Sequence, residues 1–181
     1  MKVLLLGSSG LLGHNVLQRL VADGHKVVAL VRRADAIHLP ASGFEVRIGS
    51  LSDMQPLIDA ATGCDAIVNC AGVTDMSLLH REDYSDINRD LCQRIVNTAI
   101  HHGIKILVHT STANTIGHGT ATQPADESAP MEAPFTDSYY ALSKRDGENI
   151  ILHHARQHQG ECHAVVINPG YMIGSMDVKP S

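Results

Sequence analysis

The sequence has no tryptophan, and aromatic residues make up 3% of its 181 positions. Basic residues are also scarce, because 14 Lys and Arg stand against 19 Asp and Glu and leave a net charge of −5. A nucleic-acid-binding surface needs cations that neutralise phosphates and aromatic rings on which bases stack. The sequence supplies neither, so we expect no nucleic-acid partner.

Long apolar runs are missing as well. The amino-terminal run stops at Gly7, short of the roughly 7–15 residues of a signal-peptide core. No later run approaches the about 20 residues that cross a bilayer. The four cysteines lie far apart, and the histidine-rich stretch 153–158 has no cysteine pair beside it at zinc-binding spacing. We therefore predict a cytoplasmic protein with no membrane segment, no disulfide framework and no metal site.

Apolar residues, 44% of the chain, are instead grouped in short runs that alternate with helical-period stretches. Strands are predicted at residues 3–6, 26–31, 44–48, 66–69, 105–109 and 163–167. The main helices are predicted at 11–23, 84–102 and 138–159, and a long irregular stretch is expected at 115–137. This alternation is typical of βαβ units. The sequence predicts an α/β fold, a doubly wound Rossmann-type parallel sheet of order 3-2-1-4-5-6.

Three glycines follow the first predicted strand and open directly into a helix. Gly7, Gly10 and Gly13 allow a tight turn, close approach of the backbone to a pyrophosphate and close packing of helix on strand. The helix N-terminus adds N–H donors and the positive end of its dipole. Because the loop lies within one βαβ unit, we interpret it as a dinucleotide site rather than an ordinary turn.

The residues after the second strand indicate which dinucleotide. An NAD-binding fold places Asp or Glu there to hold the ribose 2′-hydroxyl, whereas this sequence has Arg32 and Arg33. Arginine pairs well with a 2′-phosphate through charge-assisted hydrogen bonds. NADP is the predicted cofactor, and Asp35 nearby keeps NAD open as the alternative.

A tyrosine and a lysine stand one helical turn apart on the last predicted helix. Tyr140 and Lys144 therefore share a face, so the ammonium can favour the phenolate of a group whose ordinary pKa is near 10. Upstream, the hydroxyl-bearing stretch 110–112 ends the fifth strand, at the edge where ligands bind in open α/β sheets. Together they indicate proton exchange with a bound carbonyl or alcohol.

These motifs together resemble the short-chain dehydrogenase/reductase superfamily, in its extended type, which includes nucleotide-sugar epimerases, dehydratases and dihydroflavonol-reductase-like enzymes. The resemblance covers essentially the whole chain. The matching stretches are the glycine loop, 49–53, 69–72, 110–112, the Tyr140/Lys144 pair and 168–170.

The resemblance implies roles for individual residues. Thr112 would be the Ser/Thr member of the catalytic triad, Tyr140 the acid/base, and Lys144 both the pKa modifier and a ribose ligand. Asn88 stands where the family often has an asparagine and completes the predicted catalytic set. The predicted cofactor contacts are Gly7, Ser9, Gly10, Leu11, Leu12, Gly13, Arg32, Arg33, Ser50, Leu51, Cys70, Ala71, Gly72, Thr110, Ser111, Tyr140, Lys144, Asn168, Pro169 and Gly170.

The sequence departs from the family pattern in two places. Ser50 stands where the family often has an Asp that contacts the adenine, and Asp53 is interpreted as the cap of the following helix. Extended members also continue with a substrate-binding segment, which is expected beyond residue 181. Residues 1–181 would then be the NAD(P)-binding Rossmann domain together with the Tyr/Lys helix.

These observations predict an NADP-dependent oxidoreductase that moves hydride between nicotinamide and a substrate carbonyl or alcohol, with tyrosine as acid/base. A nucleotide-sugar epimerase or dehydratase, which regenerates its cofactor, is the alternative enzyme. A non-catalytic NAD(P)-binding sensor is the alternative from another class. The expected partner is a small-molecule substrate, and a homodimer is left open.

Overall fold

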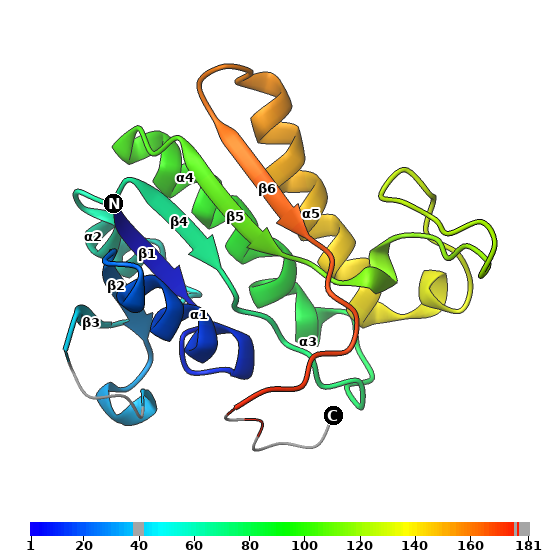
Figure 1. The fold of residues 1–181 in the computed structure, drawn as a ribbon, viewed down its shortest axis with the longest axis horizontal. Helices are drawn as coiled ribbons and strands as arrows, with labels where there is room; N and C mark the ends of the chain where they lie inside the picture. Colours follow the sequence, from blue (N-terminus) through cyan, green and yellow to red (C-terminus); the bar gives the residue numbers. More distant parts are fainter. Residues whose placement is uncertain (38–41, 176, 178–181) are drawn as a thin grey trace.

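Six parallel strands form one sheet of order β3-β2-β1-β4-β5-β6 in the computed structural model, which describes residues 1–37, 42–175 and 177 (Figure 1). The strands are β1 (Lys2–Leu6), β2 (Lys26–Val31), β3 (Phe44–Ile48), β4 (Ala66–Asn69), β5 (Ile106–Thr110) and β6 (His163–Ile167). Strand order and direction confirm the predicted doubly wound sheet.

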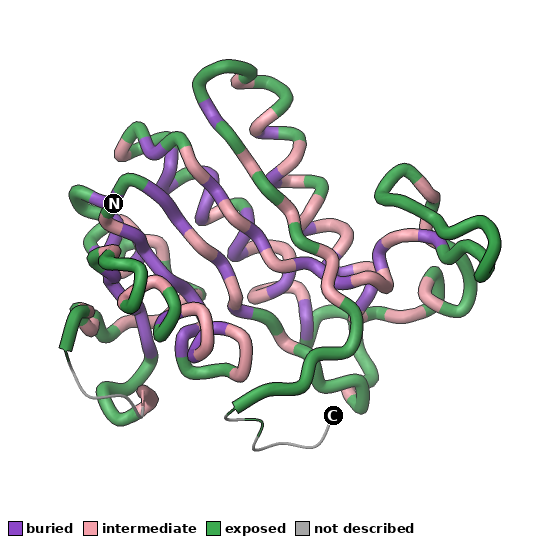
Figure 2. Tube along the Cα trace, in the orientation of Figure 1, coloured by how far each residue is buried: buried purple, intermediate pink, exposed green. Residues whose placement is uncertain are grey.

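Helices cover the two faces unequally. Helix α1 (Leu11–Ala22) packs on β1 and β2 from one side, where Leu17 meets Leu5 and Val27. Helices α2 (Met54–Ala61), α4 (Leu91–His102) and α5 (Tyr139–Gln157) lie on the other side. The central strands are buried on both faces, whereas β6 alternates exposed and half-buried residues (Figure 2).

The predicted helix 84–102 has three parts. It begins as α3 (Glu82–Ser85), passes through a π-helical turn, η2 (Asp86–Asp90), and continues as α4 until Gly103 ends it in the left-handed conformation. Helix α5 packs closely against the π-turn, since a Cβ on Gly147 would lie 2.1 Å from Asn88 O. Such bulges are frequent at functional sites, and this one holds Asn88.

Shorter elements complete the chain. Single 3₁₀ turns lie at η1 (Ala34–Ala36), η3 (Ala113–Thr115) and η4 (Phe135–Asp137). Between η3 and η4 the chain forms the predicted irregular stretch, which extends beyond β6 and α5 (Figure 1). Asp53 occupies the N-cap position of α2 as predicted, but its side chain makes no capping hydrogen bond. No helix among the described residues is long and apolar enough to span a membrane.

Candidate active site

The glycine turn between β1 and α1 is shaped by its own backbone. Gly7 has φ +81°, and a Cβ there would lie 2.5 Å from Ala71 N. At Gly13 a Cβ would lie 2.0 Å from Gly7 O, so these two glycines are required by packing. Gly10 differs, because its Cβ would meet nothing nearer than Gly7 O at 3.5 Å. The turn therefore leaves open space at the start of α1.

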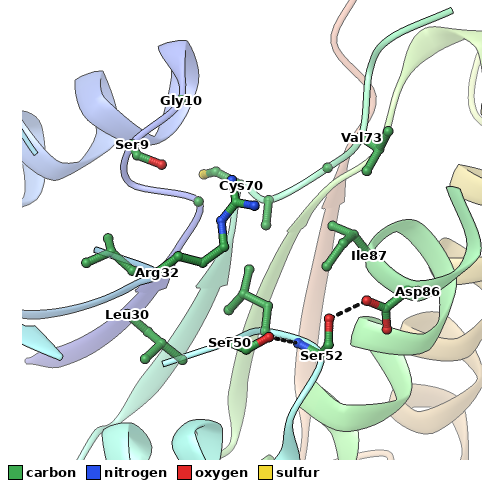
Figure 3. A pocket seen from close by; sticks show the side chains of 15 residues that line it. Ser9, Gly10, Leu30, Arg32, Ser50, Ser52, Cys70, Val73, Asp86 and Ile87 are labelled. Carbon is green, nitrogen blue, oxygen red and sulfur yellow. Dashed lines mark hydrogen bonds between the residues drawn. The ribbon is translucent and has the colours of Figure 1, made fainter. Parts of the chain in front are cut away.

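A cavity of about 450 Å³ lies at this turn, along the carboxyl ends of the central strands (Figure 3). Nine of the predicted cofactor contacts line it: Gly7, Ser9, Gly10, Arg32, Ser50, Leu51, Cys70, Ala71 and Gly72. The first turn of α1 has no acidic residue that would oppose a phosphate. Its N-terminal N–H groups have no partners within the helix, as in other anion-binding helix ends. The cavity thus fits an anionic dinucleotide.

The two arginines after β2 point in different directions. Arg32 lines the cavity, and its side chain extends into it towards Cys70 (Figure 3). Arg33 instead pairs with Asp35, with 3.3 Å between Nε and Oδ1, and both side chains are 77% exposed. Arg32 is therefore the arginine placed to meet a bound ligand.

The catalytic side chains predicted from the last helix lie beside this cavity. Lys144 is buried, and its Nζ donates to Thr110 O at 2.6 Å. A Cβ on Gly72, a cavity-lining residue, would lie 3.6 Å from that Nζ. Tyr140, one turn earlier, shares a hydrogen bond with the Thr112 hydroxyl. The structure thus brings Thr112, Tyr140 and Lys144 together at one end of the sheet.

Burial shifts the pKa values of Tyr140 and Lys144. Desolvation raises the pKa of Tyr140 above its ordinary value, and the hydrogen bond from Thr112 offsets part of the rise. Burial also lowers the pKa of Lys144, which the nearby Cys92 and Cys70 partly counteract. The phenol pKa therefore moves opposite to the direction expected from Lys144. The physical reason is that burial removes water from the phenolate, while Lys144 Nζ donates its hydrogen bond to the Thr110 carbonyl.

The model of the NAD dependent epimerase/dehydratase family matches residues 3–181. The chain belongs to this family. It is the extended group of the short-chain dehydrogenase/reductase superfamily that the motifs resemble, so that prediction is confirmed.

Curated relatives of this chain include a protein named as a ketoreductase and one named as a sterol demethylase protein. A 4-hydroxy-2-methyl-3-oxo-4-farnesyl-3,4-dihydroquinoline-1-oxide ketoreductase of Stigmatella aurantiaca is 30% identical, over 98% of this chain and 52% of the relative. Sterol demethylase protein B of Methylococcus capsulatus is 29% identical, over 100% of this chain and 54% of the relative. The chain therefore spans about half the length of these curated relatives.

Solved structures show the same fold. The UDP-glucose 4-epimerase of Thermus thermophilus in complex with NAD superposes with a TM-score of 0.77 at 22% identity, covering 93% of this chain and 54% of that one. A short-chain dehydrogenase/reductase superfamily protein of Agrobacterium tumefaciens with bound NAD gives a TM-score of 0.76 at 24% identity, covering 93% and 48%. These likenesses confirm the family's Rossmann-type fold for this chain.

Two buried asparagines hold the loop after β4 in place. Asn69 Oδ1 accepts from Ala71 N at 3.0 Å, while its Nδ2 donates to His109 Nδ1 at 3.1 Å. Asn88 Oδ1 accepts from Val73 N at 2.9 Å, and its Nδ2 lies 3.0 Å from both Val73 O and Ser143 Oγ. Asn88 thus links the cavity wall to the helix that carries Tyr140, while its predicted catalytic role stays a prediction.

The segment after β6 is held through a cluster of polar side chains. Asn168 Nδ2 lies 2.9 Å from Thr115 Oγ1 and 3.0 Å from Glu148 Oε2. Thr115 Oγ1 in turn donates to Thr112 O at 2.8 Å. The Asn168 amide therefore supports the turn that carries Thr112. Contacts of Asn168, Pro169 and Gly170 with a nicotinamide stay predictions.

The remaining predicted residues lie around the cavity rather than on its wall. Leu11, Leu12 and Gly13 form the first turn of α1, and Thr110 and Ser111 lie at the end of β5. The Ser111 hydroxyl is buried and has no hydrogen-bond partner among the described residues. The cavity also has lining residues that the sequence interpretation missed: Leu30, Val31, Ser52, Val73, Asp86 and Ile87. Asp86 and Ile87 lie in the π-turn, for which the sequence offers no local signal.

Proposed function

We propose that this chain is the cofactor-binding and catalytic part of an NADP-dependent oxidoreductase that reduces a substrate carbonyl or oxidises the corresponding alcohol. The observation that carries the proposal is the position of Lys144. Its ammonium lies beside the cavity wall at Gly72, and Lys144 follows Tyr140 by one turn of α5. Cofactor binding and proton transfer would therefore take place at one site.

Different lining residues would contact different parts of the dinucleotide. The pyrophosphate would lie against the start of α1, beside Ser9 and Gly10. Arg32 would meet the 2′-phosphate, and Ser50 and Leu51 would lie at the adenine end. When bound, the nicotinamide supplies or accepts the hydride.

The chain's own residues would handle the proton. The Tyr140 hydroxyl donates a proton to the substrate oxygen during reduction and accepts it during oxidation. Thr112, hydrogen-bonded to that phenol, orients the same oxygen. Lys144 would favour the phenolate when Tyr140 gives up its proton and would hold the ribose. Asn88 acts as a positioning residue, because its amide is already engaged with Val73 and Ser143.

The relatives and the family name favour two related chemistries. The quinoline-oxide ketoreductase and a sterol-4-alpha-carboxylate 3-dehydrogenase of Dictyostelium discoideum, 27% identical over 83% of this chain, are named for net redox reactions. The alternative function is a nucleotide-sugar epimerase or dehydratase, in which no net cofactor turnover occurs. A cytoplasmic location, a homodimer and a substrate segment beyond residue 181 stay predictions.

The test uses the complete natural protein and its Tyr140→Phe variant. NADPH oxidation at 340 nm should accompany carbonyl reduction, and the variant should lose about 10²–10⁴ in the chemical step. Calorimetry should show that the variant still binds NADP⁺, because the substitution removes only the acid/base oxygen. Turnover within a few-fold of the parent would rule out Tyr140 as the proton donor. A substrate converted without net NADPH loss would favour the epimerase alternative.

A further inference from the structure

A second cavity, of about 260 Å³, has Tyr140 among its lining residues. The loop before α3 forms one wall, and the start of α5 forms the other. Met76, Leu78 and Leu79 come from the loop, and Tyr139 and Tyr140 come from the helix. The cavity therefore adjoins the tyrosine that would exchange a proton with the substrate.

Hydrogen bonds to the backbone and side chain of Asp75 and to the backbone of Leu78 hold the loop that forms this wall. The buried Tyr84 hydroxyl donates to Asp75 O at 2.6 Å, and it lies 3.4 Å from Leu78 O. Ser77 N donates to Asp75 Oδ1 at 2.9 Å. Even so, Met76 is 68% exposed and Leu79 is 77% exposed. A loop that is anchored yet presents large apolar side chains to solvent is typical of a binding surface.

The charge around the cavity makes it unfavourable for an anionic group. Asp137 is the only charged residue among the described residues that line it. Arg81, which follows the loop, donates from NH2 to Asp146 Oδ2 at 2.6 Å. A diphosphate group would therefore meet a carboxylate and no unengaged cation in this wall. Desolvating an anion without a partner is costly, whereas an apolar group gains from the contact.

We propose that this cavity binds the apolar part of the substrate, so that the reacting carbonyl belongs to an alkyl- or ring-bearing ketone rather than to a nucleotide-linked sugar. The proposal rests on the proposed oxidoreductase function and names the substrate class of the same site. In this arrangement Tyr140 contacts both the polar end and the beginning of the apolar part of the substrate.

A homologous series of methyl ketones, from 2-butanone to 2-octanone, tests the proposal in the complete natural protein with NADPH. Each buried methylene should raise kcat/KM by about fourfold until the cavity is filled. Leu79→Gln should flatten this dependence on chain length. The matched control is Ile100→Gln, which changes another exposed apolar residue, 60% exposed on α4 and outside this cavity. The control should leave the dependence unchanged.

Binding is measured separately from turnover by labelling the methionine methyl groups with ¹³C. The chain has six methionines, and a Met76→Leu variant assigns the Met76 signal. In the presence of NADP⁺, 2-octanone should shift that signal, and UDP-glucose at the same concentration should not.

The outcomes separate this inference from the proposed function. Ketone turnover that is independent of chain length, together with a Met76 signal that 2-octanone does not move, would overturn the apolar site and leave the oxidoreductase assignment standing. A Met76 shift without any ketone turnover would refute the oxidoreductase assignment and leave the apolar site standing. A Met76 shift caused by UDP-glucose would overturn the substrate class.

Discussion

Arg32 offers a direct test of cofactor choice, because its neighbour serves as a matched control. Both residues are arginines after β2, yet Arg32 lines the cavity and Arg33 pairs with Asp35 in solvent. Arg32→Ala removes the cation that would face the 2′-phosphate. Arg33→Ala removes the same charge from the neighbouring position while leaving the cavity wall intact. The two variants thus have the same net charge.

The expected changes in cofactor affinity follow from the different environments of Arg32 and Arg33. A hydrogen bond to a charged group contributes about 1.5–3 kcal/mol, so Arg32→Ala should weaken NADP⁺ binding by roughly 10- to 150-fold. NAD⁺ has no 2′-phosphate, so its affinity should hardly change. An exposed ion pair contributes about 0–1 kcal/mol, so Arg33→Ala should change NADP⁺ affinity by less than about fivefold.

Calorimetric titration of both variants with both cofactors gives four dissociation constants to compare with those of the parent. The decisive quantity is the NADP⁺/NAD⁺ affinity ratio, because a general disturbance of the cavity would cancel from it. An unchanged ratio in Arg32→Ala would refute the assignment of Arg32 to the 2′-phosphate. A larger loss in Arg33→Ala would show that the exposed arginine contacts the ligand instead.

Three further predictions concern the turn and the buried groups. Gly13→Ala places a Cβ 2.0 Å from Gly7 O and should lower the free energy of unfolding by about 1–3 kcal/mol in urea, whereas Gly10→Ala should fold normally and lose dinucleotide affinity instead. Lys144→Ala should weaken dinucleotide binding and shift the basic limb of the pH–rate profile upward, and an unshifted limb would contradict its action on the phenolate. Burial lowers the pKa of His109 from 6.5 to about 3. As the pH falls, the unfolded state therefore binds a proton at this histidine at a higher pH than the folded state does. Stability should therefore fall as pH drops below 6.5, by about 2 kcal/mol at pH 5, and His109→Asn should reduce this dependence in urea titrations.

The order of the elements and the glycine turn could be predicted because both depend on local patterns. The predicted strands agree with the structure to within one residue at each end. Right-handed crossovers between them leave few ways to arrange six parallel strands. The spacing of Gly7, Gly10 and Gly13 is likewise a property of one short segment. The same reasoning did not reveal the π-turn at Asp86–Asp90, which is stabilised by packing against Gly147 from another helix.

What the sequence determined by itself is therefore the fold, the family and the set of residue types at the site. The tertiary structure decided how those residues are used. It separated Arg32 from Arg33, engaged Asn168 with Glu148 and raised the pKa of Tyr140 through burial. It also brought Met76 and Leu79 up to Tyr140 across about 60 positions of sequence. These outcomes depend on which side chains meet and how much water they exclude, and long-range packing sets both.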